Sequence, residues 1–293
     1  MNPVNKNPIS SSDRIAIAIM ESTTRKVNGR YEAGLLWKRP TQHLPNNRDA
    51  ALRRFYALEK FFQKDPTFGS RYGEVIEEYL RLGHARRLEV NDLIGPPGAT
   101  WYLLHHGILN SSNKLRVVFD TSASFQGTKL NDKLLEGPDY LTPQFDVILR
   151  FRENAVAVSS DVEKMFHQVR VRAADRPALR FLWRTLGSVG PPGTYEMQVK
   201  IFGAVCSPTT YTFVLQKTAR DNDRSCPGLE RVLIEDFYVD NFQPLIKART
   251  RRFLCRSHCP DSWSSVGPAS PNGCHPPRGC SVVSRPKDYQ TLS

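Results

Sequence analysis

The sequence predicts an α+β fold, because segments with helical and with strand-like hydrophobic spacing both recur along its 293 residues. Two stretches, 47–62 and 72–80, carry apolar side chains at the i, i+3, i+4 spacing of a helix face. Several later runs are short, rich in β-branched and aromatic residues, and bounded by Gly or Pro. Helices followed by mostly antiparallel strands are typical of the α+β class, and the length allows one large domain or two small ones.

The first third of the chain predicts a polar tail, a short strand and two helices. Residues 1–28 are polar and predict a tail or linker with one short helical or extended segment, although the apolar run 15–20 is expected to belong to a core element. A short strand is expected over 31–38, closed by Pro40. Two helices follow: Asn47 is placed to cap the first, and Gly83 to end the second.

The middle of the chain predicts strands separated by turns and two helices. The expected strands are 101–104 and 115–119, joined by a turn at 110–113, then 155–161, 169–171, 180–183, 195–201 and the apolar run 232–237. The expected helices are 141–152 and 209–219, the second starting at Pro208.

The last segment, 247–293, has scattered Ser, Pro, Gly, Cys and Arg and no periodic apolar pattern, so it predicts a low-order, disordered tail. Four of the six cysteines lie there, with His258 and His275 among them. The spacings Cys255-x3-Cys259 and Cys274-x5-Cys280 do not reproduce a standard zinc motif, so reduced thiols are the expectation.

The net charge and the length of the apolar runs indicate which classes of partner the chain can have. The formal net charge of +12 fits a surface that meets nucleic acid, and the alternative is a basic protein with solvated Lys and Arg. No apolar run approaches the roughly 18 residues that a bilayer span needs, so no membrane partner is expected. The cytoplasm is the expected location, with the nucleus or virus-like particles as alternatives, and the oligomeric state is left open.

Two acidic residues occupy positions where strands end. Asp161 closes the strand 155–161, and Asp240 lies in a tight turn between Tyr238 and Phe242. Two strand-end carboxylates that converge are what a pair of divalent cations needs to hold a triphosphate and activate a hydroxyl. The alternative for each residue alone is a turn residue without a ligand.

Seven ordered blocks between about residues 13 and 246 resemble the polymerase region of a Pao/BEL-type long-terminal-repeat retrotransposon polyprotein. The blocks are Leu44–Arg48, Tyr79–His84, Trp101–Gly107, Lys114–Asp120, Ser160–Gln168, Phe202–Pro208 and Tyr238–Phe242. The resemblance implies the fingers and palm of a right-hand polymerase over 29–246, with the thumb missing. It also implies an RNA-directed DNA polymerase whose partners are an RNA template or RNA–DNA hybrid, a DNA primer and dNTPs.

The resemblance also implies residue roles. Two Mg²⁺ ions, or Mn²⁺, would be held by Asp161, Asp240 and the main-chain carbonyl of Val162. Asn241 stands where a second Asp is usual, and the amide removes one negative charge beside the cations. The implied dNTP-binding residues are Lys114, Arg116, Phe166, Phe202 and Gly203, with Phe166 as the ring that excludes a 2′-hydroxyl, and the implied template or primer contacts are Gln168 and Tyr238.

Each of these roles has a structural alternative. Phe166 is equally a core residue, Lys114 and Arg116 a solvated strand face, and Gly203 a turn glycine. For the whole chain, the alternatives are a catalytically inactive nucleic-acid-binding remnant, or a chain whose core is cut before a thumb can pack. The loss of pattern after about residue 247 suggests a frameshifted or unrelated tail, which the other two reading frames of the coding DNA would test.

Overall fold

The structure, a computed structural model, describes residues 9–150, 156–224, 228–235, 237–239, 241–242 and 281–284. The chain forms two compact units: a large unit of residues 1–138 and 166–211, and a small unit of residues 139–165 and 212–293. Helices and strands are mixed in both, which confirms the α+β class. Within the described ranges no helix is both long and apolar enough to cross a membrane.

The large unit begins with helix α1 (Ser11–Thr23), which Ser10 caps by accepting from the backbone N of Asp13 at 3.0 Å. Ala16 and Met20 on α1 are completely buried, so the run 15–20 is a core element as expected. The segment around it is not simply a linker, because a 13-residue helix and the first strands follow one another closely. Strands β1 (Arg25–Val27), β2 (Arg30–Ala33) and β7 (Arg170–Val171) form one sheet, with β1–β2 antiparallel and β2–β7 parallel.

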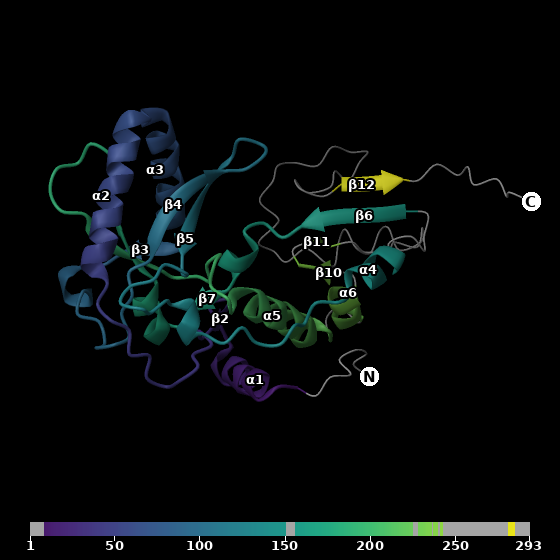
Figure 1. Cartoon of the computed structure of the whole chain (residues 1–293). Coiled ribbons are helices and arrows are strands. Elements are labelled where there is room, and N and C mark those ends of the chain that lie inside the picture. The colour runs from purple at the N-terminus through teal and green to yellow at the C-terminus, as the bar shows by residue number, and fades with distance from the viewer. Residues whose placement is uncertain are drawn as a thin grey trace, which may run out of the picture. The chain divides into compact units, whose positions relative to one another are not determined.

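Helices α2 (Arg48–Lys64) and α3 (Pro66–Arg81) form a pair beside the β4–β5 hairpin (Figure 1). Asn47 occupies the N-cap position of α2 as expected, but its side chain makes no capping hydrogen bond. Its buried side chain instead accepts from the backbone N of Tyr102 and donates to the backbone O of the same residue, both at 2.8 Å. The Asn47 side chain therefore bonds both backbone polar groups of a residue far away in sequence, since an amide carries both a donor and an acceptor. Gly83, with φ of 66°, follows the end of α3 as expected.

Aromatic rings on α2 and α3 pack against the antiparallel sheet β3-β9-β8 (Ala85–Arg87, Gly193–Met197 and Arg180–Trp183). Tyr72 stacks on Trp183 with ring centroids 5.5 Å apart, and Phe62 lies 5.0 Å from Tyr72. The Tyr72 hydroxyl lies 2.6 Å from Nδ1 of His105, whose Nε2 lies 2.9 Å from the carbonyl of Leu182. Since a carbonyl only accepts, Nε2 carries the proton and Nδ1 accepts from Tyr72.

The remaining sheet of the large unit is the hairpin β4 (Leu104–Leu109) and β5 (Leu115–Asp120). The turn at 110–113 is as expected, but the first strand begins three residues later than the expected 101–104. Trp101 and Tyr102 instead run beside β8, where the Arg180 backbone N donates to Trp101 O at 3.2 Å. The described part of the chain also contains four 3-10 helices: Val90–Asp92, Asn131–Lys133, Met165–Gln168 and Ala173–Leu179.

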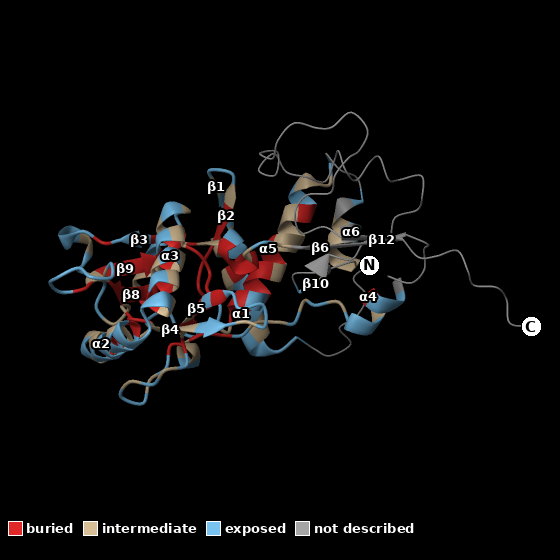
Figure 2. Cartoon of the chain, turned by 90° about the horizontal axis from the view of Figure 1, so that it is seen from above, coloured by how far each residue is buried: buried red, intermediate tan, exposed pale blue. Residues whose placement is uncertain are grey.

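Among the residues whose burial is described, most of the buried ones lie in the large unit, and Figure 2 shows them in red near α3, β8 and β9. One buried carboxylate organises its polar interior. Asp175 accepts from the backbone N of Leu35 at 2.8 Å, from Nε1 of Trp37 at 2.9 Å and from Nε of Arg172 at 2.7 Å. Fully buried Lys200 donates to the carbonyl of Gly34 at 2.6 Å, and its burial lowers its pKa.

The small unit contains helices α4 (Gln144–Arg150) and α6 (Leu229–Glu235) and the sheet β10-β11-β6-β12. Its strands are Phe237–Tyr238, Asn241–Phe242, Val156–Asp161 and Ser281–Ser284. The last of these is a strand that the tail 247–293 was not expected to contain. Helix α5 (Ser207–Asn222) begins in the large unit and ends in the small one.

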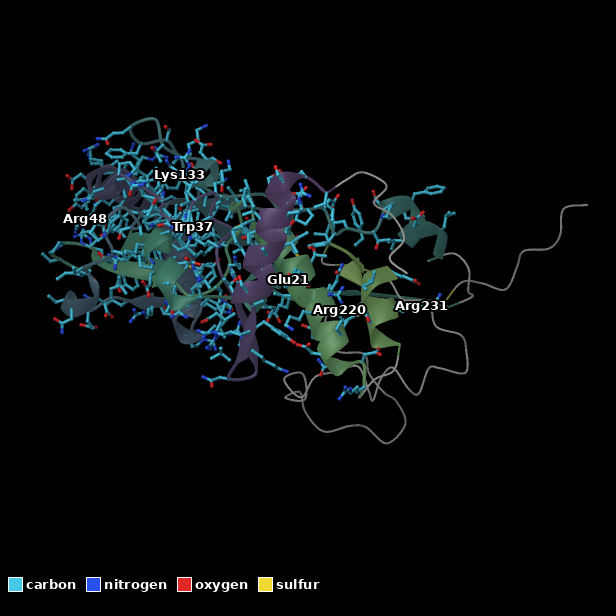
Figure 3. The ribbon with its side chains drawn as sticks, turned by 90° about the horizontal axis from the view of Figure 1, so that it is seen from below. Glu21, Trp37, Arg48, Lys133, Arg220 and Arg231 are labelled. Atoms are coloured by element: carbon cyan, nitrogen blue, oxygen red, sulfur yellow. The ribbon has the colours of Figure 1, made fainter. Side chains whose placement is uncertain are left out.

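The expected strand over 232–237 is wrong for its first part, because residues up to Glu235 belong to α6. Leu229, Val232 and Leu233 have helical spacing, and a short apolar run fits both kinds of element until its partners are known. Ion pairs hold the helix: Arg220 of α5 with Glu230, and Arg231 with Glu235, each at 2.9 Å. Figure 3 labels Arg220 and Arg231 on their two helices.

Candidate functional site

The hairpin β10–β11 has a two-residue loop, because Tyr238 pairs with Asn241 and Phe237 with Phe242. Val239, the first loop residue, has φ of 60°. A positive φ is required in the loop of a type I′ hairpin, and a β-branched residue adopts it only at a steric cost. The loop therefore keeps a strained residue beside Asp240, which lies outside the described residues.

Strand β11 pairs with β6 in the register that a site of two strand ends requires. Asn241 is directly opposite Asp161, and Phe242 is opposite Ser160. Directly opposed residues of an antiparallel pair have Cα atoms about 5 Å apart and lie on the same face of the sheet. The end of β6 and the hairpin loop are therefore neighbours in the backbone, although residues 161 and 241 are 80 positions apart.

The chain leaves the sheet immediately after this point. Val162 is half-buried, and Lys164 has φ of 50°, which turns the backbone sharply toward the helix Met165–Gln168. The backbone therefore turns at residues 163–164 and is helical from Met165 onward. Tyr238 is half-buried on β10, in the same small unit as Asp161 and Asn241.

Val239 also lines a small pocket of the small unit. The other residues around it come from the segment before α4, from α5 and from α6, and they are Tyr140, Leu141, Thr142, Thr212, Leu215, Gln216, Leu233 and Ile234. The Thr142 hydroxyl donates to the carbonyl of Ile234 at 2.6 Å, which ties the α6 end to the segment before α4. Val239 of the hairpin loop therefore lies among mostly apolar side chains.

The residues expected to contact a nucleotide lie mainly in the large unit, where two of them are in contact. The rings of Phe166 and Phe202 have centroids 4.5 Å apart, and Tyr211 lies 6.1 Å from Phe166. Phe166 is only 7% exposed, whereas Phe202 is 49% exposed. Phe202 thus presents a ring to solvent that rests on a buried ring.

Gly203 follows this exposed ring with φ of 99°. A Cβ at this position would lie 2.8 Å from the carbonyl O of Phe119, so only glycine fits. The Gly203 carbonyl accepts from the Thr121 hydroxyl at 2.6 Å and from Nδ2 of Asn131 at 2.9 Å, and Oδ1 of Asn131 accepts from the backbone N of Val205 at 3.1 Å. Sequence reasoning did not find Asn131, and an isolated Asn gives no motif from which to find it.

Lys114 and Arg116 are both exposed, on the turn and strand of the β4–β5 hairpin. Arg116 is opposite Ile108, which is 45% exposed, so this face of the hairpin is open to solvent. Neither cation has an ion pair within the part of the chain that the structure describes. Gln168 is exposed as well, at the end of the helix Met165–Gln168.

His105 and His106 point to opposite faces of β4, as alternation along a strand predicts. His106 is exposed, whereas His105 lies among Tyr72, Phe119 and Phe181. Burial lowers the pKa of His105 to about 4. It is therefore a neutral core residue at neutral pH.

No family model matches the chain, and a search of curated proteins finds no match. The residues themselves carry the argument for a site. Among the side chains that the structure describes, no three His, Cys, Asp or Glu are grouped as metal ligands, but Asp161 and Asp240 are not among those side chains. The donors expected at the strand ends are carboxylate and carbonyl oxygens, which suit Mg²⁺.

Proposed function

We propose that this chain is the fingers and palm of an RNA-directed DNA polymerase of the Pao/BEL retrotransposon type. The observation that carries the proposal is the β6–β11 register, in which Asp161 is opposite Asn241 and one residue along from Asp240. The order of the seven sequence blocks supports it independently. The substrates would be dNTPs and a primer paired to an RNA template.

In this function Asp161, Asp240 and the main-chain carbonyl of Val162 would hold two Mg²⁺ ions, with Mn²⁺ as a substitute. Bound there, the ions would lower the pKa of the primer hydroxyl and neutralise charge on the phosphates. Asn241 would contribute an amide oxygen without the negative charge of a second Asp at that position. The missing charge weakens the field that stabilises charge in the transition state, so slow turnover is expected.

Contacts to the nucleotide would come from cationic and aromatic side chains. Exposed Arg116 and Lys114 offer donors for the β- and γ-phosphates, and the planar fork of Arg suits two phosphate oxygens at once. The exposed ring of Phe202 is suited to stack on a base, and Phe166 beneath it would set the space available at the sugar. Gln168 and Tyr238 would contact the template or primer.

The test is primer extension on an RNA template with Mg²⁺, run in parallel on the unaltered chain and on Asn241→Asp. The variant is expected to extend the primer about 100-fold faster, because restoring one group that stabilises transition-state charge is worth roughly 10²–10³ in rate. Asp161→Asn is the control and should abolish extension in both backgrounds. Extension that survives Asp161→Asn would refute the assignment of the site.

A second function is favoured by Asn241 itself: a nucleic-acid-binding remnant without turnover. It would show salt-dependent binding of an RNA–DNA hybrid and no extension by either the unaltered chain or Asn241→Asp. Extension after the single change Asn241→Asp would exclude this alternative, because it places the defect at the metal site alone.

A further inference from the structure

One face of the β1-β2-β7 sheet is crowded with arginines. The register sets Arg25 opposite Glu32 and Glu32 opposite Arg170, so three strands contribute one row of charged residues. Arg30 lies two positions before Glu32 on β2, on the same face. The opposite face carries Tyr31, Ala33 and Val171, all buried. On the charged face Glu32 is buried as well, whereas Arg25 is exposed and Arg30 and Arg170 are half-buried, so this face is open to solvent at its arginines and covered at Glu32.

The single carboxylate of this row is shared. Glu32 accepts from Arg25 at 2.9 Å and from Arg176, which follows β7, at 3.3 Å. Arg30 donates to the carbonyl of His167 at 2.6 Å. Arg170 has neither an ion pair nor a side-chain hydrogen bond within the residues that the structure describes. Two guanidinium groups therefore contact Glu32, and Arg30 and Arg170 add two further positive charges on the same face.

The pKa values of two of these arginines are lowered, in part by the neighbouring arginines. Burial and the charge of Arg170 both lower the pKa of Arg30. Burial lowers the pKa of Arg176 as well, and the charges of Arg86 and Arg170 add to this, while Glu32 and Glu196 oppose it. Burial is the larger cause of both shifts, and the part that comes from neighbouring guanidinium groups is repulsion that a bound anion would offset.

We propose that Arg25, Arg30, Arg170 and Arg176, here called the arginine face, bind the phosphodiester backbone of nucleic acid. Guanidinium groups form paired hydrogen bonds to phosphate oxygens. Neighbouring strands lie about 4.8 Å apart, so the row from Arg25 to Arg170 spans about 10 Å and reaches more than one phosphate. This site shares no residue with the proposed polymerase site and would function whether or not the chain polymerises.

Two features favour nucleic acid over an acidic peptide. The chain's net charge of +12 attracts a polyanion over long range. The donors also lie in a row along a sheet face, which suits a repeating backbone. The face contains no aromatic ring for stacking on bases, since Tyr31 is on the buried side. Binding is therefore expected to be independent of base sequence.

The test measures binding of a fluorescein-labelled RNA–DNA hybrid by anisotropy, over a range of salt concentrations and without Mg²⁺ or dNTPs. Arg170→Gln should lower the slope of log K against log salt by about 1, and Arg25→Gln with Arg170→Gln by about 2, as expected for one lost phosphate contact per residue. Arg53→Gln is the matched control, because Arg53 is exposed on α2 and its substitution removes the same single positive charge. Its slope should stay unchanged.

Equal slopes for Arg170→Gln and Arg53→Gln, in variants that unfold in urea like the unaltered chain, would overturn the proposal. Displacement of the hybrid by polyglutamate as readily as by unlabelled hybrid would also overturn it, in favour of an acidic peptide. The binding assay contains neither Mg²⁺ nor dNTPs, so it does not depend on turnover at the proposed polymerase site. A failure of polymerase activity and a failure of the arginine face therefore give different results.

Discussion

The large and the small unit differ in how their residues are held. In the large unit, buried polar and charged side chains bond backbone groups distant in sequence, as Asn47 does with Tyr102 and Asp175 with Leu35. In the small unit, α4 exposes Phe145 and Leu149, which are 69% and 49% accessible. Stability is therefore expected to come mainly from the large unit, while the paired strand ends of the proposed metal site lie in the small one.

The largest expected effect compares one aromatic residue from each unit. Trp183→Ala in the large unit removes a 3% exposed ring that packs on Tyr72 and should lower the free energy of unfolding by about 3–5 kcal/mol. Phe145→Ala in the small unit removes an exposed ring and should change it by less than about 0.5 kcal/mol. Urea denaturation followed by circular dichroism measures both, and similar losses would contradict the comparison.

The next comparison is between a buried charged residue of the large unit and a half-exposed one of the small unit. Asp175→Ala leaves the buried donors of Leu35 and Trp37 without an acceptor and should cost about 3 kcal/mol. Its counterpart is Lys217→Ala, which breaks a half-exposed pair with Asp221 on α5 and should cost no more than about 0.5 kcal/mol. The same denaturation curves report both values. A loss at Lys217 as large as that at Asp175 would show that surface pairs also support the small unit.

His105 gives a dependence on pH that belongs to the large unit alone. Its pKa in the folded chain is about 4, below the ordinary value of 6.5, so the unfolded chain binds the proton more tightly. The stability that it contributes is complete above pH 6.5 and is lost as the pH falls toward 4. Between pH 7 and pH 5 this amounts to about 2 kcal/mol.

Comparing urea midpoints of the unaltered chain and of His105→Asn at both pH values isolates this contribution. The variant should lose less stability than the unaltered chain between pH 7 and pH 5. Equal losses would mean that His105 titrates normally in the folded state.

The smallest expected difference separates a close contact from backbone strain. Gly203→Ala places a Cβ 2.8 Å from a carbonyl at a φ of 99° in the large unit, whereas Gly228→Ala, at a φ of 86° in the small unit, meets nothing within 4 Å. Both variants pay roughly 1 kcal/mol for the positive φ, and Gly203→Ala should cost about 1 kcal/mol more. Equal unfolding free energies for the two variants would show that the loop at Gly203 shifts without cost.

The sequence was sufficient for the elements with long or regular patterns. Helices α2 and α3, strands β6 and β8 and the turn at 110–113 lie where hydrophobic period and turn residues predict. It failed at α6, where seven residues are too few for a period to separate helix from strand. It also failed to predict the hydrogen bonds of the Asn47 side chain, because the preference of Asn for a helix cap does not reveal a distant backbone partner.

The residues of the candidate site also divide into those that the sequence could predict and those that it could not. Asp161 and the hairpin at Tyr238 could be named from strand ends and from the family resemblance, but their register is a tertiary property that only the folded chain shows. Asn131, Asp175 and the arginine face depend on contacts across long sequence separations. No local pattern marks such residues, because their neighbours along the chain carry no information about their partners in space.

The two hydrogen bonds that converge on the Gly203 carbonyl have a mechanical consequence. Thr121 lies just beyond β5, and Asn131 lies in the next short helix. Both side chains donate to the Gly203 carbonyl in the loop that carries Phe202. A movement of the Phe202 loop must therefore either break these two hydrogen bonds or carry the segment that follows β5 with it.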